Sequence, residues 1–154
     1  MSAPSQRPEP GADRGFSIRL CDWAQDAPAL RRVRREVFIV EQRIPENLEW
    51  DDADATSLHA LAEDGAGEPI GCGRLLADGH VGRLAVLRAW RGRGVGAALL
   101  GTLVDQARQR GHRRVVLNAQ TQAMPFYARH GFEPSGSEFD EAGIPHREMS
   151  RSLA

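Results

Sequence analysis

The chain has 154 residues, 41% of them hydrophobic and 27% charged, which fits one globular domain and argues against two. Its formal net charge is -1, so no global excess of positive charge directs it to nucleic acid or to an anionic membrane. No apolar run approaches the ~20 residues that a bilayer-spanning helix needs. The N-terminus also lacks the apolar stretch of a secretory signal, so we expect a cytoplasmic protein.

The first residues differ from the rest of the chain in composition. Residues 1–15 are rich in Pro and Gly and nearly devoid of large apolar side chains, so we expect a tail, followed by a single domain over 16–154. Alternation in residues 16–20 predicts a half-buried strand. Asp26 is then expected to cap a helix that tolerates Pro28 in its first turn. The expected buried face of that helix carries Leu30, Val33, Val37 and Val40.

An acidic segment follows this helix. Residues 43–56 contain Pro45 and a cluster of carboxylates, which favours a loop. Strands are predicted at 57–63, 70–77 and 81–86, because apolar stretches there are separated by Gly-containing turns. The acidic cluster consists of Glu46, Glu49, Asp51, Asp52 and Asp54.

The second half of the chain alternates helices and strands. A helix is predicted from the glycine-rich loop to about Arg110, and Gly111 is expected to end it in a left-handed conformation. The segment 115–117 is typical of a buried strand. A short helix over 124–130 and strands over 132–137 and 146–152 complete the chain, and this order indicates an α+β protein with one central mixed sheet.

The loop RGRGVG at 91–96 lies between a predicted strand and a predicted helix. Glycines allow close approach of a ligand to the backbone, and the first N–H groups of a helix are unpaired at the positive end of its dipole, so a diphosphate fits there. A Walker loop is excluded because the chain has no Lys. A dinucleotide fold is disfavoured because the next strand ends in Leu117-Asn118 without an acidic residue.

Several separated segments, in this order, resemble the GNAT superfamily of acetyl-CoA-dependent N-acetyltransferases. The similarity is to its small bacterial ElaA/YjcF-like branch, which also resembles glyphosate N-acetyltransferase. This resemblance implies a central mixed, mostly antiparallel β-sheet with helices on both faces and a splay between the fourth and fifth strands. The matching segments are VFIVEQ (37–42), GRLAV (82–86), RGRGVG (91–96), LNAQTQ (117–122), PFYARHGF (125–132) and GIPH (143–146).

The resemblance implies acetyl-CoA as cosubstrate, and no metal. Neither Cys21 nor Cys72 belongs to a C-x-x-C pair, and the histidines have no mutual metal-ligand spacing. Tyr127, the only tyrosine, matches the residue that protonates the departing thiolate. The cofactor-binding residues implied by the resemblance are Leu84, Ala85, Val86, Arg91, Gly92, Arg93, Gly94, Val95, Gly96, Asn118 and Tyr127.

Two residues compete as general base. An amine with a pKa near that of lysine is about one part in a thousand neutral at pH 7, so its attack on a thioester benefits from a proton acceptor. His146 matches the histidine proposed as base in the glyphosate-acetylating relatives, and Glu41 is the rival, acting through water. The alternative, non-catalytic interpretations are that His146 only binds a turn carbonyl and that Glu41 lies at a solvated helix end.

The acceptor is left open between two charge types. The acidic segment 46–54 would suit a cationic substrate, although such charge runs are usually just solvated. Arg34 and Arg83 would face an anionic one, and Gln120 stands where glyphosate acetyltransferase has an arginine, which puts phosphonate recognition in doubt. By resemblance we expect a small-molecule amine or peptide acceptor, a homodimer, and no nucleic-acid or membrane partner.

Two function classes therefore stand. The first is an enzyme that transfers acetyl directly to a primary amine, and the second is a non-catalytic acyl-CoA-binding or sensing module. The presence of both Tyr127 and His146 favours the enzyme, because a pure binder needs neither.

Overall fold

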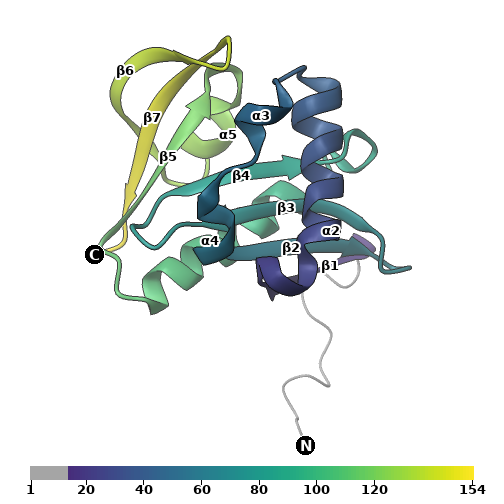
Figure 1. Cartoon of the computed structure of the whole chain (residues 1–154). Coiled ribbons are helices and arrows are strands. Elements are labelled where there is room, and N and C mark those ends of the chain that lie inside the picture. Colours follow the sequence, from purple (N-terminus) through teal and green to yellow (C-terminus); the bar gives the residue numbers. More distant parts are fainter. Residues whose placement is uncertain (1–13) are drawn as a thin grey trace, which may run out of the picture.

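The computed structural model describes residues 14–154, and most of the expected N-terminal tail lies outside that range. Two antiparallel sheets lie side by side (Figure 1), one with strand order β1-β2-β3-β4 and the other with order β5-β7-β6. The strands are β1 Phe16–Cys21, β2 Leu58–Asp64, β3 Pro69–Leu75, β4 Val81–Val86, β5 Arg114–Gln120, β6 Glu133–Glu141 and β7 Ile144–Ser152.

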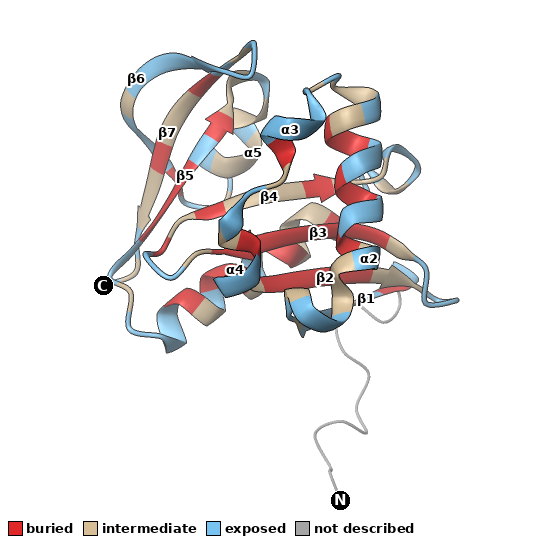
Figure 2. Cartoon of the chain, viewed as in Figure 1, coloured by how far each residue is buried: buried red, intermediate tan, exposed pale blue. Residues whose placement is uncertain are grey.

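Helices cover both faces of the first sheet. Helix α2 (Trp23–Arg34) packs on one face and α4 (Val95–Gln109) on the other, while α3 (Glu46–Glu49) and α5 (Met124–Ala128) are short. Successive residues of β2 divide between the two cores, with Ala60 and Ala62 under α4 and Leu61 under α2. Figure 2 accordingly shows β2 and β3 buried along most of their length. The expected α+β fold is confirmed.

The start and the buried face of α2 differ from the prediction. Asp22, not Asp26, caps the helix, because its carboxylate accepts from Gln25 N at 2.9 Å. Asp26 instead binds Arg19 at 2.8 Å. Pro28 consequently lies inside the helix, beyond its first turn.

The C-terminal part of this helix is π-helical over Arg35–Glu41, with Gln42 N donating to Val37 O at 3.1 Å. The wider turn rotates the side chains away from the α-helical register. Phe38 is buried beside Val37, whereas Val40 is 58% exposed. The expectation that Val40 lies on the buried face was therefore wrong.

Two further differences concern segments with little apolar patterning. The predicted loop 43–56 holds α3 and a 3-10 helix over Asp52–Thr56. Strands β6 and β7 form a longer hairpin than predicted, because residues 138–141 are exposed and, apart from Phe139, acidic, yet pair with β7. Gly111 has φ +87°, as predicted for the end of α4. None of the described helices is both long and apolar enough to cross a membrane.

Candidate active site

The two sheets are joined at one end of β4 and β5. The contact between the strands is a parallel bridge between His80 and Val116, where Val116 N donates to Gly79 O at 3.2 Å. Beyond this bridge β4 pairs with β3 and β5 pairs with β7. A cavity of about 670 Å³ opens between the separated strands. The splay expected between the fourth and fifth strands is present.

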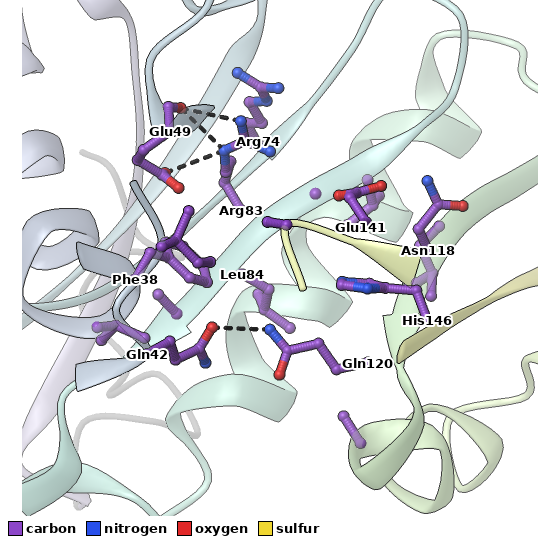
Figure 3. A pocket seen from close by; sticks show the side chains of 18 of the residues that line it. Phe38, Gln42, Glu49, Arg74, Arg83, Leu84, Asn118, Gln120, Glu141 and His146 are labelled. Carbon is purple, nitrogen blue, oxygen red and sulfur yellow. Dashed lines mark hydrogen bonds and ion pairs between the residues drawn. The ribbon is translucent and has the colours of Figure 1, made fainter. Parts of the chain in front are cut away.

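Three walls enclose this cavity (Figure 3). The residues of β4 form one wall, and the π-helical segment with the chain after it supplies Phe38, Gln42 and Ile44 as the second. The third wall comes from β5 and the β6–β7 hairpin. Its residues are Leu117, Asn118, Gln120, Glu141, Ala142 and His146.

The glycine loop begins helix α4 beside the cavity. Gly94 is the N-cap of α4 with φ +88°, a conformation that favours glycine, and no side chain of the described residues caps the helix. The first N–H groups of α4 therefore remain available to an anion. Arg93 stacks on Trp90, with its guanidinium carbon 4.1 Å from the ring centroid. Arg14 also approaches the loop, since a Cβ on Gly94 would lie 3.0 Å from its Nη1.

Arg91 and Glu41 form a bidentate ion pair. Arg91 Nη1 and Nη2 donate to the Glu41 carboxylate at 2.7 and 2.6 Å, and Nε donates to Val86 O at 2.9 Å. The hydrogen bonds from Arg91 hold the pKa of Glu41 below its usual value. Arg91 lines the cavity, but Glu41 is not among the lining residues. Glu41 therefore ties the π-helical segment to the glycine loop, a geometry that does not suit the base role expected for it.

His146 points into the cavity from β7 (Figure 3) and is only 7% exposed. Its Nδ1 lies 2.7 Å from the carbonyl oxygen of Ile144. Because a carbonyl only accepts, Nδ1 must carry a proton, and in the neutral ring Nε2 then has the lone pair. Phe139 stacks on the imidazole with a centroid distance of 5.8 Å. The ring is thus held with its unprotonated nitrogen available to a ligand.

Tyr127 lines the same cavity from α5. Phe126 and Phe132 meet its ring edge-on, at centroid distances of 5.1 and 6.0 Å. Burial raises the pKa of Tyr127 to about 12. The hydroxyl therefore stays protonated at neutral pH, as a proton donor requires.

Asn118 and Gln120 lie on the cavity face of β5. The side chain of Asn118 is exposed to the cavity and makes no hydrogen bond to a described residue. Gln120 Nε2 donates to Gln42 Oε1 at 2.9 Å, and Gln122 donates to Gln120 at 2.6 Å. This contact (Figure 3) joins β5 to the π-helical wall across the cavity.

The acidic segment and the arginines form a buried network. Arg34 is 1% exposed and binds Glu49 at 2.8 Å and Asp54 at 2.7 Å. It does not line the cavity, so the expected contact between Arg34 and an anionic substrate is not possible in this arrangement. Arg83 does line it, yet its Nε lies 3.1 Å from Glu49. In the segment 46–54, which was expected to be solvated or to hold a substrate, Glu46, Glu49, Asp51 and Asp54 instead pair with arginines, and only Asp52 has no ion pair with a described residue.

Among the cavity-lining residues that sequence reasoning did not assign to the site are Phe38, Arg74, Asp78 and Glu141. Phe38 lies within the matching segment VFIVEQ but was given no role there, and Arg74 and Asp78 belong to no motif. A sequence signal could have placed Glu141, because Ala142 and Gly143 form the turn of the β6–β7 hairpin and so pair Glu141 with Ile144, two residues before His146. No group of three His, Cys, Asp or Glu side chains in residues 14–154 is arranged to hold a metal ion.

Comparisons with known proteins agree with this geometry. The model of the Acetyltransferase (GNAT) domain matches residues 25–153. The chain is 42% identical to the Bacillus subtilis protein described as uncharacterized N-acetyltransferase YjcF, over 77% of this chain and 87% of that protein. A crystal structure of an acyl-CoA N-acyltransferase from Pseudomonas aeruginosa superposes with a TM-score of 0.80 at 29% identity, covering 89% of this chain and 99% of the other. Escherichia coli ElaA gives a TM-score of 0.80 at 27% identity with the same coverage.

Proposed function

Because the chain belongs to the GNAT acetyltransferase family, we propose that it transfers acetyl from acetyl-CoA directly to a primary amine of a small molecule or peptide. As a family member it is an N-acyltransferase, and the acceptor is the part that we propose. The observation that carries the proposal is the cavity between β4 and β5, because His146 Nε2 and the protonated Tyr127 both face it.

The residues around the cavity fit acetyl-CoA. Beyond the His80–Val116 bridge, the edge of β4 that faces β5 has no strand partner within residues 14–154, which suits an extended pantetheine arm along Leu84, Ala85 and Val86. The uncapped start of α4 at Gly94 offers N–H donors and the positive end of a helix dipole to a diphosphate. The cosubstrate supplies the thioester as acetyl donor.

His146 is the proposed general base. An amine substrate arrives mainly as an ammonium ion at neutral pH, and the Nε2 lone pair accepts the proton that must leave before or during attack. The Ile144 carbonyl keeps the opposite nitrogen protonated and fixes the ring orientation. The nitrogen of the acceptor then forms the new C–N bond while the thioester C–S bond breaks.

Tyr127 is the proposed general acid. Its hydroxyl gives a proton to the departing sulfur, so that free coenzyme A thiol leaves, and the second proton that the acceptor nitrogen loses as the amide forms restores the hydroxyl. The proton that His146 takes from the ammonium ion passes to solvent. Glu41 acts on the reaction only through Arg91, which it orients beside the glycine loop. We therefore class Glu41 as a positioning residue.

A free-thiol assay tests the proposal. Purified protein should release thiol from acetyl-CoA when primary amines are supplied, with the acetylated amine identified by mass spectrometry. Coenzyme A binding without thiol release for any amine would instead support the acyl-CoA-binding module, because that function requires the cavity but no turnover.

A further inference from the structure

Every arginine that lines the cavity already has a carboxylate partner. An arginine paired in this way leaves little positive charge for a substrate anion. An acceptor with a carboxylate or phosphonate would have to displace one of these internal partners. The pairs are Arg74 with Asp51 and Asp54, Arg83 with Glu49, and Arg91 with Glu41.

Two carboxylates on the cavity wall have no arginine partner among the described residues, namely Asp78 and Glu141. Asp78 Oδ1 accepts from the backbone N–H of His80 and also lies 3.0 Å from the ring nitrogen Nδ1 of His80. The Glu141 carboxylate has neither an ion-pair nor a hydrogen-bond partner within residues 14–154, and it lies on the same side of the cavity as Asn118 and His146 (Figure 3). The uncompensated charge of the cavity is therefore negative.

The β6–β7 hairpin fixes Glu141 relative to His146. Glu141 pairs with Ile144, and Phe139 pairs with His146, so Glu141 and His146 are diagonal neighbours on one face of the hairpin. Diagonal neighbours lie roughly 7–8 Å apart between Cα atoms. The turn between them has positive φ at both central residues, +54° at Ala142 and +79° at Gly143, which is the geometry of a tight hairpin.

His146 and the apolar lining residues define the remaining chemistry of the cavity. His146 is more than nine-tenths buried, and its Nε2 has no partner among the described residues although it faces the cavity. The apolar side chains Phe38, Ile44 and Leu84 also line the cavity. The cavity thus combines a site for one amine, an apolar wall and a site for a second positive charge.

We propose that the acceptor is an alkyl diamine or polyamine, with one amine at His146 Nε2 and a second ammonium group bound by Glu141, beside the negative charge of Asp78. This inference rests on the proposed acetyl transfer. The reaction gives the mono-N-acetyl diamine and coenzyme A, and the second ammonium group is unchanged throughout.

Three acceptors of equal chain length test the proposal: cadaverine, pentylamine and δ-aminovalerate. The diamine should exceed the monoamine in kcat/KM by about tenfold, as expected for a charge-assisted hydrogen bond, and the amino acid should be the poorest acceptor. Glu141→Gln should bring the ratio of cadaverine to pentylamine close to one. Asp140→Asn is the matched control, because Asp140 is adjacent on β6 but outside the cavity lining, and it should keep the wild-type ratio.

Equilibrium binding separates this inference from the acetyl transfer itself. Calorimetry in the presence of coenzyme A should show cadaverine binding that weakens about tenfold in Glu141→Gln and is unchanged in Asp140→Asn. Acetylation of pentylamine or δ-aminovalerate as efficient as that of cadaverine would overturn the diamine assignment while leaving the transferase intact. Cadaverine binding that is equal in wild type and Glu141→Gln would overturn the assignment even without turnover.

Discussion

At the scale of single residues, two proton-carrying side chains line the cavity in opposite protonation states. The Ile144 carbonyl leaves His146 Nε2 as an acceptor, whereas burial keeps Tyr127 protonated by raising its pKa to about 12. Both residues were identified from a family resemblance. Sequence spacing could not show that they face one cavity, because one lies on α5 and the other on β7.

Tyr127→Phe should lower kcat by about a hundredfold or more, since a positioned general acid is worth that amount. Coenzyme A affinity and folding should be preserved, because the ring keeps its contacts with Phe126 and Phe132. Steady-state kinetics and calorimetry measure the two quantities. A wild-type kcat with a good amine would mean that water, not Tyr127, protonates the leaving sulfur.

Glu41→Gln should raise KM for acetyl-CoA several-fold and leave the shape of the pH profile of kcat/KM unchanged. The reason is that the amide cannot hold both guanidinium nitrogens of Arg91 as the carboxylate does, so the glycine loop loses an anchor. Kinetics at saturating amine measure this change. If Glu41→Gln lost the acidic limb of its kcat/KM profile, Glu41 and not the proposed His146 would be the base.

At the scale of elements, the glycine loop and α4 were predicted well because strand, loop and helix each have a local signal. The π-helical turn was not, because i→i+5 bonding over Arg35–Glu41 depends on packing that the α-helical period does not contain. It is this turn that places Glu41 against Arg91 and Gln42 against Gln120.

Gly94→Val should weaken coenzyme A binding by at least about tenfold, because φ +88° is strained for a β-branched residue and a side chain would lie where a diphosphate approaches the backbone. Calorimetry on the folded variant measures the affinity. Gly92→Ala serves as a comparison, because its φ is also positive but no described atom lies within 4 Å of the added Cβ, so it separates backbone strain from side-chain bulk. Unchanged affinity in folded Gly94→Val would remove the loop from the cofactor site.

At the scale of the whole molecule, a sheet covered by helices and a second sheet separate along β4 and β5 and create the cavity, and the order of elements was enough to predict this fold class. The buried charge network was beyond prediction. Asp54 and Arg34 are 20 positions apart, and the acidic segment looked solvated because nothing in its composition reveals which carboxylates are buried. Pairing across such separations is decided by the tertiary fold.

Asp51→Asn should destabilise the protein at neutral pH. Hydrogen bonds from Arg74 lower the pKa of Asp51 to about 2, below its unfolded value of about 3.9, so the pair stabilises the fold above the unfolded pKa and loses this effect as pH falls toward 2. The difference in urea midpoint between wild type and variant should therefore be largest near neutrality and shrink in acid. Equal midpoints at neutral pH would show that the Asp51–Arg74 pair contributes nothing measurable.

The central claim is that the cavity between β4 and β5 brings an amine to His146. The most direct measurement is kcat/KM for acetyl transfer to an amine from about pH 5.5 to 9, in wild type and in folded His146→Ala, with acceptors of different basicity to separate the amine's own ionisation. We predict a rate loss of about a hundredfold or more in the variant and disappearance of the acidic limb that belongs to the enzyme. A His146→Ala protein that keeps both the wild-type rate and the wild-type pH profile would contradict the account.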